Sequence, residues 1–242
     1  MPRGKPDWGV DWTPRTVRGL EDLGEHAVRL GSPHMWDRRG DVILQDTFEY
    51  GLCMPDRALS GLGAAADLEE CHSWWGANSA RLIPGSNLAQ YAWLVYRHGL
   101  PANSRIGLEF TFTLAAETEF WYWYLGWRDG TVERFGEVRY DHQTDILEAD
   151  ERIGGFTEFA SGLDLAVGER VWHTGKLVVD FNAYDYVRFI LNEQEYNLTG
   201  RDIGQTAIGV PRELFVYVGH YGTAGNNPHG FVDNVILTQN EP

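Results

Sequence analysis

The sequence predicts an all-β protein folded as a sandwich of two antiparallel sheets. In 105–114, apolar residues alternate without a break with polar or small ones, which is typical of a strand with one buried face. Residues 176–198 read as two antiparallel strands and a tight turn at 192–194. β-Prone segments that carry carboxylates stand near both ends, at 43–49 and 230–237. Because strands from the two chain ends can pair and close a sandwich, the three observations agree.

About ten strands follow from the pattern, at the spacing of a sandwich or barrel. The first is expected near Val42, and an irregular stretch, 51–78, comes after it. Within this stretch, 64–72 is the best helix candidate in the chain. The remaining strands are expected at 79–83, 91–97, 105–114, 120–127, 134–140, 170–182, 186–192, 214–221 and 231–238.

The chain length fits one large domain. A sequence of 242 residues with 43% hydrophobic residues can bury a full core, which we expect within 41–242. In residues 1–40, tryptophans and prolines are scattered without a helical or strand period. We expect an irregular arm there, packed on the body or on a neighbouring subunit of a homo-oligomer, because exposed tryptophan is unfavourable.

Charge and composition exclude several classes of partner. The net charge of −15 makes nucleic acid and anionic membranes unfavourable partners. The acidic excess is compatible with divalent cations, although it more often only increases solubility. With no apolar signal segment and no run of membrane-spanning length, the chain as it stands is expected to be cytoplasmic, while a longer precursor could be secreted. Cys53 and Cys71 are expected to be two buried thiols, with a disulfide as the alternative if the protein is exported.

Two motifs resemble those of a known superfamily. The hairpin turn at 192–196 and the final segment Asp233-Asn-Val235 are similar to those of the concanavalin A-like lectin/glucanase jelly roll, over about residues 41–238. The core-facing side chains expected from the hairpin are Leu177, Val179, Phe181, Val187, Phe189 and Leu191. Since this superfamily holds lectins, carbohydrate-binding modules, glycosidases and polysaccharide lyases, the resemblance implies a carbohydrate-binding or carbohydrate-active protein with a saccharide in its concave groove.

The resemblance also implies one structural Ca²⁺. Its ligands would be Glu49 and Asp233, with Asp46 as a weaker third, and backbone carbonyls would complete the shell of six to eight oxygens that Ca²⁺ takes. The alternative is a closure without metal. In that case Asp233 caps a turn by accepting backbone hydrogen bonds, and Glu49 is solvated.

An aromatic run at 120–127 supplies candidate ligand-binding residues. Strand alternation places the more apolar set, which includes Trp121 and Trp123, toward the core and the tyrosines outward, where aromatic rings could stack on the flat faces of sugars. The alternative is that both faces are buried, one of them under the arm. The groove candidates on three strands are Tyr122, Tyr124, Arg128, Glu137, Arg139, Tyr217 and Tyr221.

No diagnostic catalytic motif is present, so the reaction stays open. Glu148 and Asp150 share a face, but they lie in a polar segment that reads as a turn, and they match poorly the acidic strand of retaining glucanases. His220 and His229 are candidate general bases, or else polar surface residues. A lyase centre could combine Tyr221, His220, Arg139 and Asn226, although their spacing does not require it. Hydrolase, lyase and a structural, self-associating protein therefore remain as alternatives to a binding protein.

Overall fold

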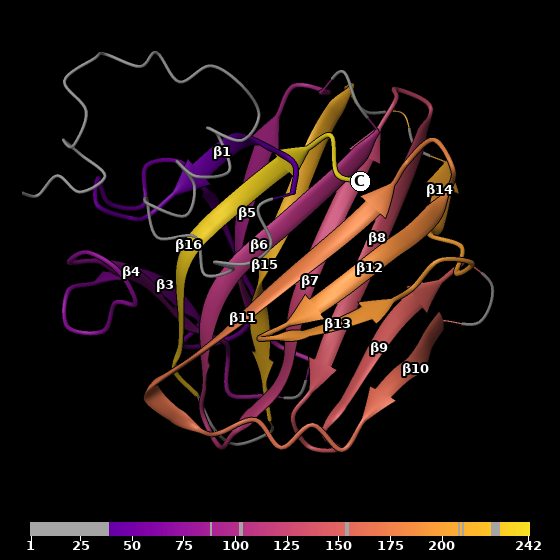
Figure 1. Ribbon diagram of the computed structural model, residues 1–242. Helices are drawn as coiled ribbons and strands as arrows, with labels where there is room; N and C mark the ends of the chain where they lie inside the picture. The colour runs from indigo at the N-terminus through magenta and orange to yellow at the C-terminus, as the bar shows by residue number, and fades with distance from the viewer. Residues whose placement is uncertain are drawn as a thin grey trace, which may run out of the picture.

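A computed structural model describes residues 39–87, 89–101, 104–152, 155–207, 209, 211–223 and 228–242. These residues form two eight-stranded sheets, and all their strand pairs are antiparallel. No helix occurs in the described part of the chain, and hence none that could cross a membrane. The two sheets pack as the layers of a sandwich (Figure 1), which confirms the predicted fold class. Residues 1–38 of the expected N-terminal arm lie outside the described part of the chain.

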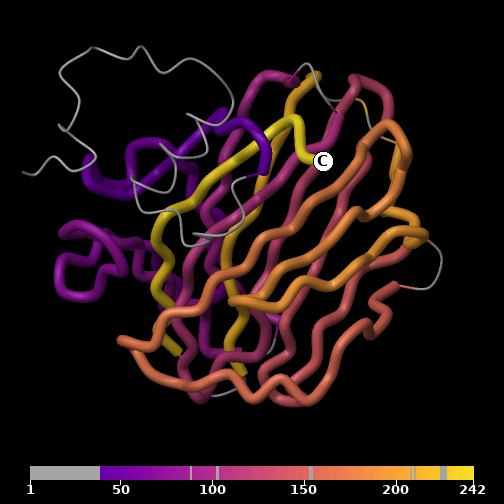
Figure 2. The backbone as a smooth tube through the Cα atoms, viewed as in Figure 1, coloured from indigo at the N-terminus to yellow at the C-terminus, as the bar shows by residue number. Residues whose placement is uncertain are grey.

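Sheet A runs in the order β13–β12–β11–β6–β16–β4–β3, and β1 also pairs with β16. Its strands are β1 Asp41–Asp46, β3 Ala65–Glu69, β4 Ser79–Ile83, β6 Arg105–Leu114, β11 Gly168–Asp180, β12 Asp185–Leu191, β13 Gln194–Asn197 and β16 Gly230–Gln239. The pairing of β1 with β16 joins the two ends of the domain, as the sequence predicts, with Asp46 opposite Val235. Figure 2 shows these indigo and yellow segments side by side.

Sheet B runs in the order β10–β9–β8–β7–β15–β5–β2, and β14 pairs with β8. Its strands are β2 Asp56–Leu59, β5 Tyr91–His98, β7 Thr118–Arg128, β8 Val132–Asp141, β9 Ile146–Glu151, β10 Gly155–Ser161, β14 Gly204–Ala207 and β15 Glu213–Gly222.

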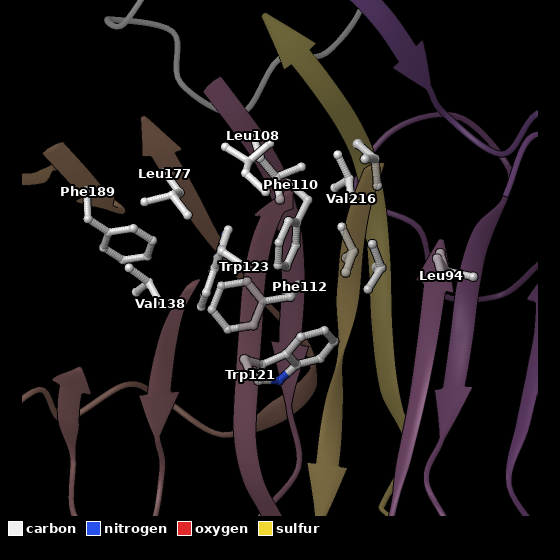
Figure 3. Close-up of a cluster of buried hydrophobic side chains, with 14 of the residues drawn as sticks. Leu94, Leu108, Phe110, Phe112, Trp121, Trp123, Val138, Leu177, Phe189 and Val216 are labelled. Carbon is white, nitrogen blue, oxygen red and sulfur yellow. The ribbon is translucent and has the colours of Figure 1, made fainter. Parts of the chain in front are cut away.

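The core lies between the sheets and is rich in aromatic rings. Trp121 and Trp123 of β7 are fully buried and pack against Phe110 and Phe112 of β6, with ring centroids 4.8 Å apart for Phe110 and Trp123 (Figure 3). The alternation in 120–127 therefore assigns the core face correctly. Burial of side chains of this size contributes about 1.5–3 kcal/mol each to folding.

Strand β6 is buried on both faces, whereas its alternation predicts only one buried face. The outward residue Glu109 is 2% exposed, and it lies beside the buried Lys176 of β11. Lys176 also binds Glu241 at 2.9 Å, and Glu241 in turn binds Arg188. The C-terminal residues thus cover this central strand with a buried ionic cluster, whose charges are tolerated because they are paired.

Several local predictions are wrong. The helix candidate 64–72 contains strand β3, which pairs along its whole length with β4, and this pairing overrides the local sequence preference. Val187 lies at a register shift between β11 and β12, and Tyr186 is fully buried in its place. Cys53 and Cys71 are unbonded as expected, but both are exposed rather than buried.

Candidate functional site

The outer face of sheet B carries a continuous set of aromatic and charged side chains, which we call the aromatic face. Its members alternate with core residues along β5, β7, β8, β9, β10 and β15. They are Tyr91, Trp93, Phe120, Tyr122, Tyr124, Arg128, Phe135, Glu137, Arg139, Glu148, Asp150, Phe156, Phe215, Tyr217 and Tyr221.

Strand register brings the predicted groove residues together. One row across the sheet holds Tyr217 of β15, Tyr124 of β7 and Glu137 of β8. In the next row, Tyr122 of β7 stands opposite Arg139 of β8. The candidates chosen from three separate strands therefore form one surface, because each strand presents its alternate residues to the same side.

A ladder of half-buried rings lies on one side of this face. Tyr91 and Trp93 stack with ring centroids 3.9 Å apart, and Trp93 stacks on Tyr217 at 5.1 Å. Gly219 makes room for the indole, because a Cβ atom there would lie 2.4 Å from Cδ1 of Trp93. Tyr221 joins the ladder through a tilted contact with Tyr91 and an edge-to-face contact with the indole. The result is a partly exposed aromatic surface fixed by ring-on-ring packing.

The two central tyrosines are less exposed than the sequence suggests. Tyr122 is 8% exposed, with Tyr221 and Phe156 packed beside its ring. The hydroxyl of Tyr124 donates a hydrogen bond to Glu133 at 2.8 Å. Burial raises the pKa of Tyr122 to about 12, so this phenol is neutral at ordinary pH.

Both arginines of the predicted groove are held in ion pairs. Arg139 donates from Nε to Glu148 at 2.6 Å, and its guanidinium lies 3.7 Å from the ring centroid of Phe156. Arg128 pairs with Glu133 at 3.0 Å and with Glu213 at 2.5 Å. Their charges are therefore compensated before any ligand binds.

Glu137 and Asp150 differ from these paired carboxylates. Within the described residues, no hydrogen bond or salt bridge reaches the carboxyl group of either, and both are half-buried. Burial raises the pKa of Glu137 to about 7, with a further increase from the charge of Asp150 and a partial offset by Arg139. Burial also raises the pKa of Asp150, again opposed by Arg139. Carboxylic acids that have a perturbed pKa and no ion-pair partner, on an accessible face, are typical of functional sites.

A tyrosine of sheet A reaches through the core to the backbone below these two acids. The hydroxyl of Tyr186 accepts a hydrogen bond from the amide of Glu137 at 2.9 Å and donates one to the carbonyl of Asp150 at 2.7 Å. The regular pairing of β8 with β9 ends one residue earlier, at Val138 and Ala149. The hydroxyl of Tyr186 thus lies between β8 and β9 at the point where the next direct backbone hydrogen bond between these strands would otherwise form.

Sequence reasoning missed part of this face. Tyr91 and Trp93 could have been found, because they alternate with core residues in 91–97. Glu148 and Asp150 lie on strand β9, not in a turn, and Phe156 follows on β10. These two strands at the end of sheet B are polar because one of their faces meets solvent, so they lack the apolar period that identifies a strand.

The histidines do not join this site. His220 is fully buried behind the sheet, stacks on Trp121 and bonds the carbonyl of Leu82 through Nε2 at 3.0 Å. Burial lowers its pKa to about 4. The expectation of a polar surface residue is wrong, because the imidazole is fully buried in the core. His229 is exposed, and Asn226 lies outside the described residues.

The predicted calcium ligands meet across one loop. Asp233 accepts hydrogen bonds from the amides of Trp74 at 2.8 Å and Trp75 at 2.9 Å, and Glu49 accepts from Ala77 at 2.8 Å and from residue 78 at 3.0 Å. The third candidate, Asp46, instead accepts from the backbone of residue 48 and the hydroxyl of residue 96. In the described ranges no group of three or more acidic, histidine or cysteine side chains gathers around one point. Calcium stays a prediction, in competition with a hydrogen-bonded closure.

Comparisons with known proteins bear on the fold. No protein-family model matches the sequence, and no curated protein is similar to it. Among solved structures, an endo-β-1,4-glucuronan lyase from the fungus Trichoderma reesei and the alginate lyase vAL-1 from a Chlorella virus are similar, each with 11% identity and a TM-score of 0.52. Each comparison covers 82% of this chain, and 95% and 100% of the two lyases. The chain therefore has the concanavalin A-like jelly-roll fold that such structures share.

Proposed function

We propose that the protein binds a saccharide chain on the aromatic face of sheet B. The observation that carries this proposal is the ladder of Tyr91, Trp93 and Tyr217, whose rings stack in register and stay partly exposed. Sugar rings present flat C–H surfaces to such rings, while nearby polar groups bind the hydroxyls.

The surroundings of the ladder supply the polar groups. Tyr221 and Glu137 lie within the same face, and the hydroxyl of Tyr122 is 3.4 Å from the guanidinium of Arg139. The two similar lyases act, by their names, on the polysaccharides glucuronan and alginate, which supports a carbohydrate role in general. Their identity to this chain is too low to transfer a substrate.

Binding is tested by titrating the protein with soluble polysaccharides and following tryptophan fluorescence and heat. Trp93→Ala and Tyr91→Ala are each expected to weaken binding about tenfold, equivalent to about 1.4 kcal/mol, because each removes a stacking ring. The matched control is Tyr50→Ala, which removes an aromatic ring that is 93% exposed and lies outside this face. Equal affinity of all three variants and the unmodified protein would remove the aromatic face as the binding site.

A further inference from the structure

Two acids stand side by side at the margin of the aromatic face. Glu137 on β8 and Asp150 on β9 occupy the position next to the pair Val138–Ala149, so their side chains leave the sheet on the same side. Neither carboxyl group is bound by another described residue, in contrast to Glu148 one row away. Leaving two acids unpaired in a half-buried place costs stability, which suggests selection for something other than folding.

The core holds this pair in position from below. Because the hydroxyl of Tyr186 bonds the backbone of both residues, it fixes the spacing of the two strands at the point where the acids stand. Tyr124 flanks Glu137 in the same row, and Arg139 lies in the next. After burial, Asp150 and Arg139 act on the pKa of Glu137, the first raising it and the second lowering it. Burial and the charge of Glu137 in turn raise the pKa of the tyrosines packed around it, which are Tyr122, Tyr124, Tyr186 and Tyr221.

The charges of the face select against an anionic ligand. The guanidinium of Arg139 is bound by Glu148, and that of Arg128 by Glu133 and Glu213. A uronate would therefore have to displace these carboxylates, and it would also meet the charge of Asp150. An uncharged sugar meets neither obstacle.

We propose that Glu137 and Asp150 form an acid–base pair that hydrolyses a glycosidic bond of an uncharged saccharide held on the aromatic face. This proposal rests on the proposed function and adds to it a reaction and a class of substrate. It also distinguishes the proposed reaction from the elimination reaction of a polysaccharide lyase, which requires a uronate substrate.

The reaction consumes one water molecule. Glu137 gives its proton to the bridging oxygen as the bond from that oxygen to the anomeric carbon breaks. Asp150 takes a proton from a water whose oxygen bonds to the same carbon, and exchange with solvent then restores both acids. The pKa of Glu137 at about 7 keeps its carboxyl group protonated in mildly acidic solution, as the role of proton donor requires.

The test uses the full chain and two sets of polymers. Mixed-linkage β-glucan, xylan and glucomannan are uncharged, while alginate and polyglucuronate are anionic. Release of reducing ends and absorbance of unsaturated products in the ultraviolet are measured for each, together with binding. Glu137→Gln and Asp150→Asn are compared with Glu193→Gln, which makes the same change at an exposed turn of sheet A.

We expect reducing ends from at least one uncharged polymer, with a rate that falls above pH 7. Glu137→Gln and Asp150→Asn should each lower this rate by about 100-fold or more, with affinity changed less than about threefold, and Glu193→Gln should leave both unchanged. Binding of an uncharged polymer without cleavage would overturn the acid–base pair and leave the proposed function standing. Unsaturated products from a uronate polymer would overturn both the reaction and the substrate class. Failure to bind any polymer would remove the proposed function as well.

Discussion

Nε of Arg139 lies 2.6 Å from Oε2 of Glu148, so the arginine of the aromatic face is neutralised by its neighbour on the next strand. The guanidinium is also enclosed by rings, with Phe120 at 4.5 Å and Phe156 at 3.7 Å from the respective centroids. Such a cation is pre-oriented but no longer available as a free positive charge, because its partner is already bound.

Glu148→Gln should therefore change charge selection more than it changes the fold. We expect a loss of about 1 kcal/mol in the free energy of unfolding, since the pair is partly buried, together with a gain in affinity for alginate oligosaccharides as Arg139 is released. Urea unfolding and calorimetric titration measure the two effects. Unchanged rejection of alginate would mean that the ion pair does not set the charge preference of the face.

The unpaired state of Glu137 predicts a dependence of stability on pH. Its pKa is about 7 in the folded protein, whereas the ordinary value of a glutamate side chain is 4.5, so between these values the folded state holds more protons than the unfolded state. Stability therefore falls as pH rises through this range. Glu137→Gln stays neutral, and it should be more stable than the unmodified protein above pH 7 by about 1–3 kcal/mol and equal to it below about pH 4.

Chemical denaturation at a series of pH values checks this prediction. Asp150 and Asp233 also have raised pKa values, but both remain in the variant, so the difference between the two proteins reports Glu137. A difference that does not vary with pH would contradict the raised pKa.

Tyr186→Phe should remove the hydroxyl that links the backbones of β8 and β9. The substitution leaves the amide of Glu137 and the carbonyl of Asp150 without their shared partner, at an expected cost of about 1–3 kcal/mol in unfolding free energy. Tyr184→Phe is the control, because this nearby hydroxyl belongs to an exposed turn. Equal stability of the two variants would show that water replaces the buried hydroxyl at no cost.

The sequence predicted those elements whose pattern is local. The bounds expected for 79–83 and 105–114 agree with β4 and β6, and alternation separates Trp121 and Trp123 from the outward tyrosines, because period two alone decides which face a side chain takes. The pairing of the terminal strands was also predictable from their β-prone composition.

Long-range contacts explain what could not be predicted. The inward position of Tyr186 depends on a register shift between β11 and β12, which no local pattern reports. The burial of His220 follows from its stack on Trp121 and its bond to Leu82, both distant in sequence. The pairing of Arg139 with Glu148 required β9, whose polar composition resembles a turn.

Glu49 and Asp233 both bind the backbone of the loop 74–78, and this arrangement predicts an effect of calcium on stability. Burial raises the pKa of Asp233 to about 7, and the charge of Glu49 adds to the increase, so the two carboxylates repel each other across the loop. A bound Ca²⁺ would relieve this repulsion and, as a ligand of the folded state, would stabilise the protein by mass action. Calcium should then raise the melting temperature of metal-free protein, and Asp233→Asn should abolish the increase. If calcium and chelator both leave the melting temperature unchanged, the amide hydrogen bonds to Asp233 and Glu49 close the loop without metal, because these donors already occupy the carboxylates.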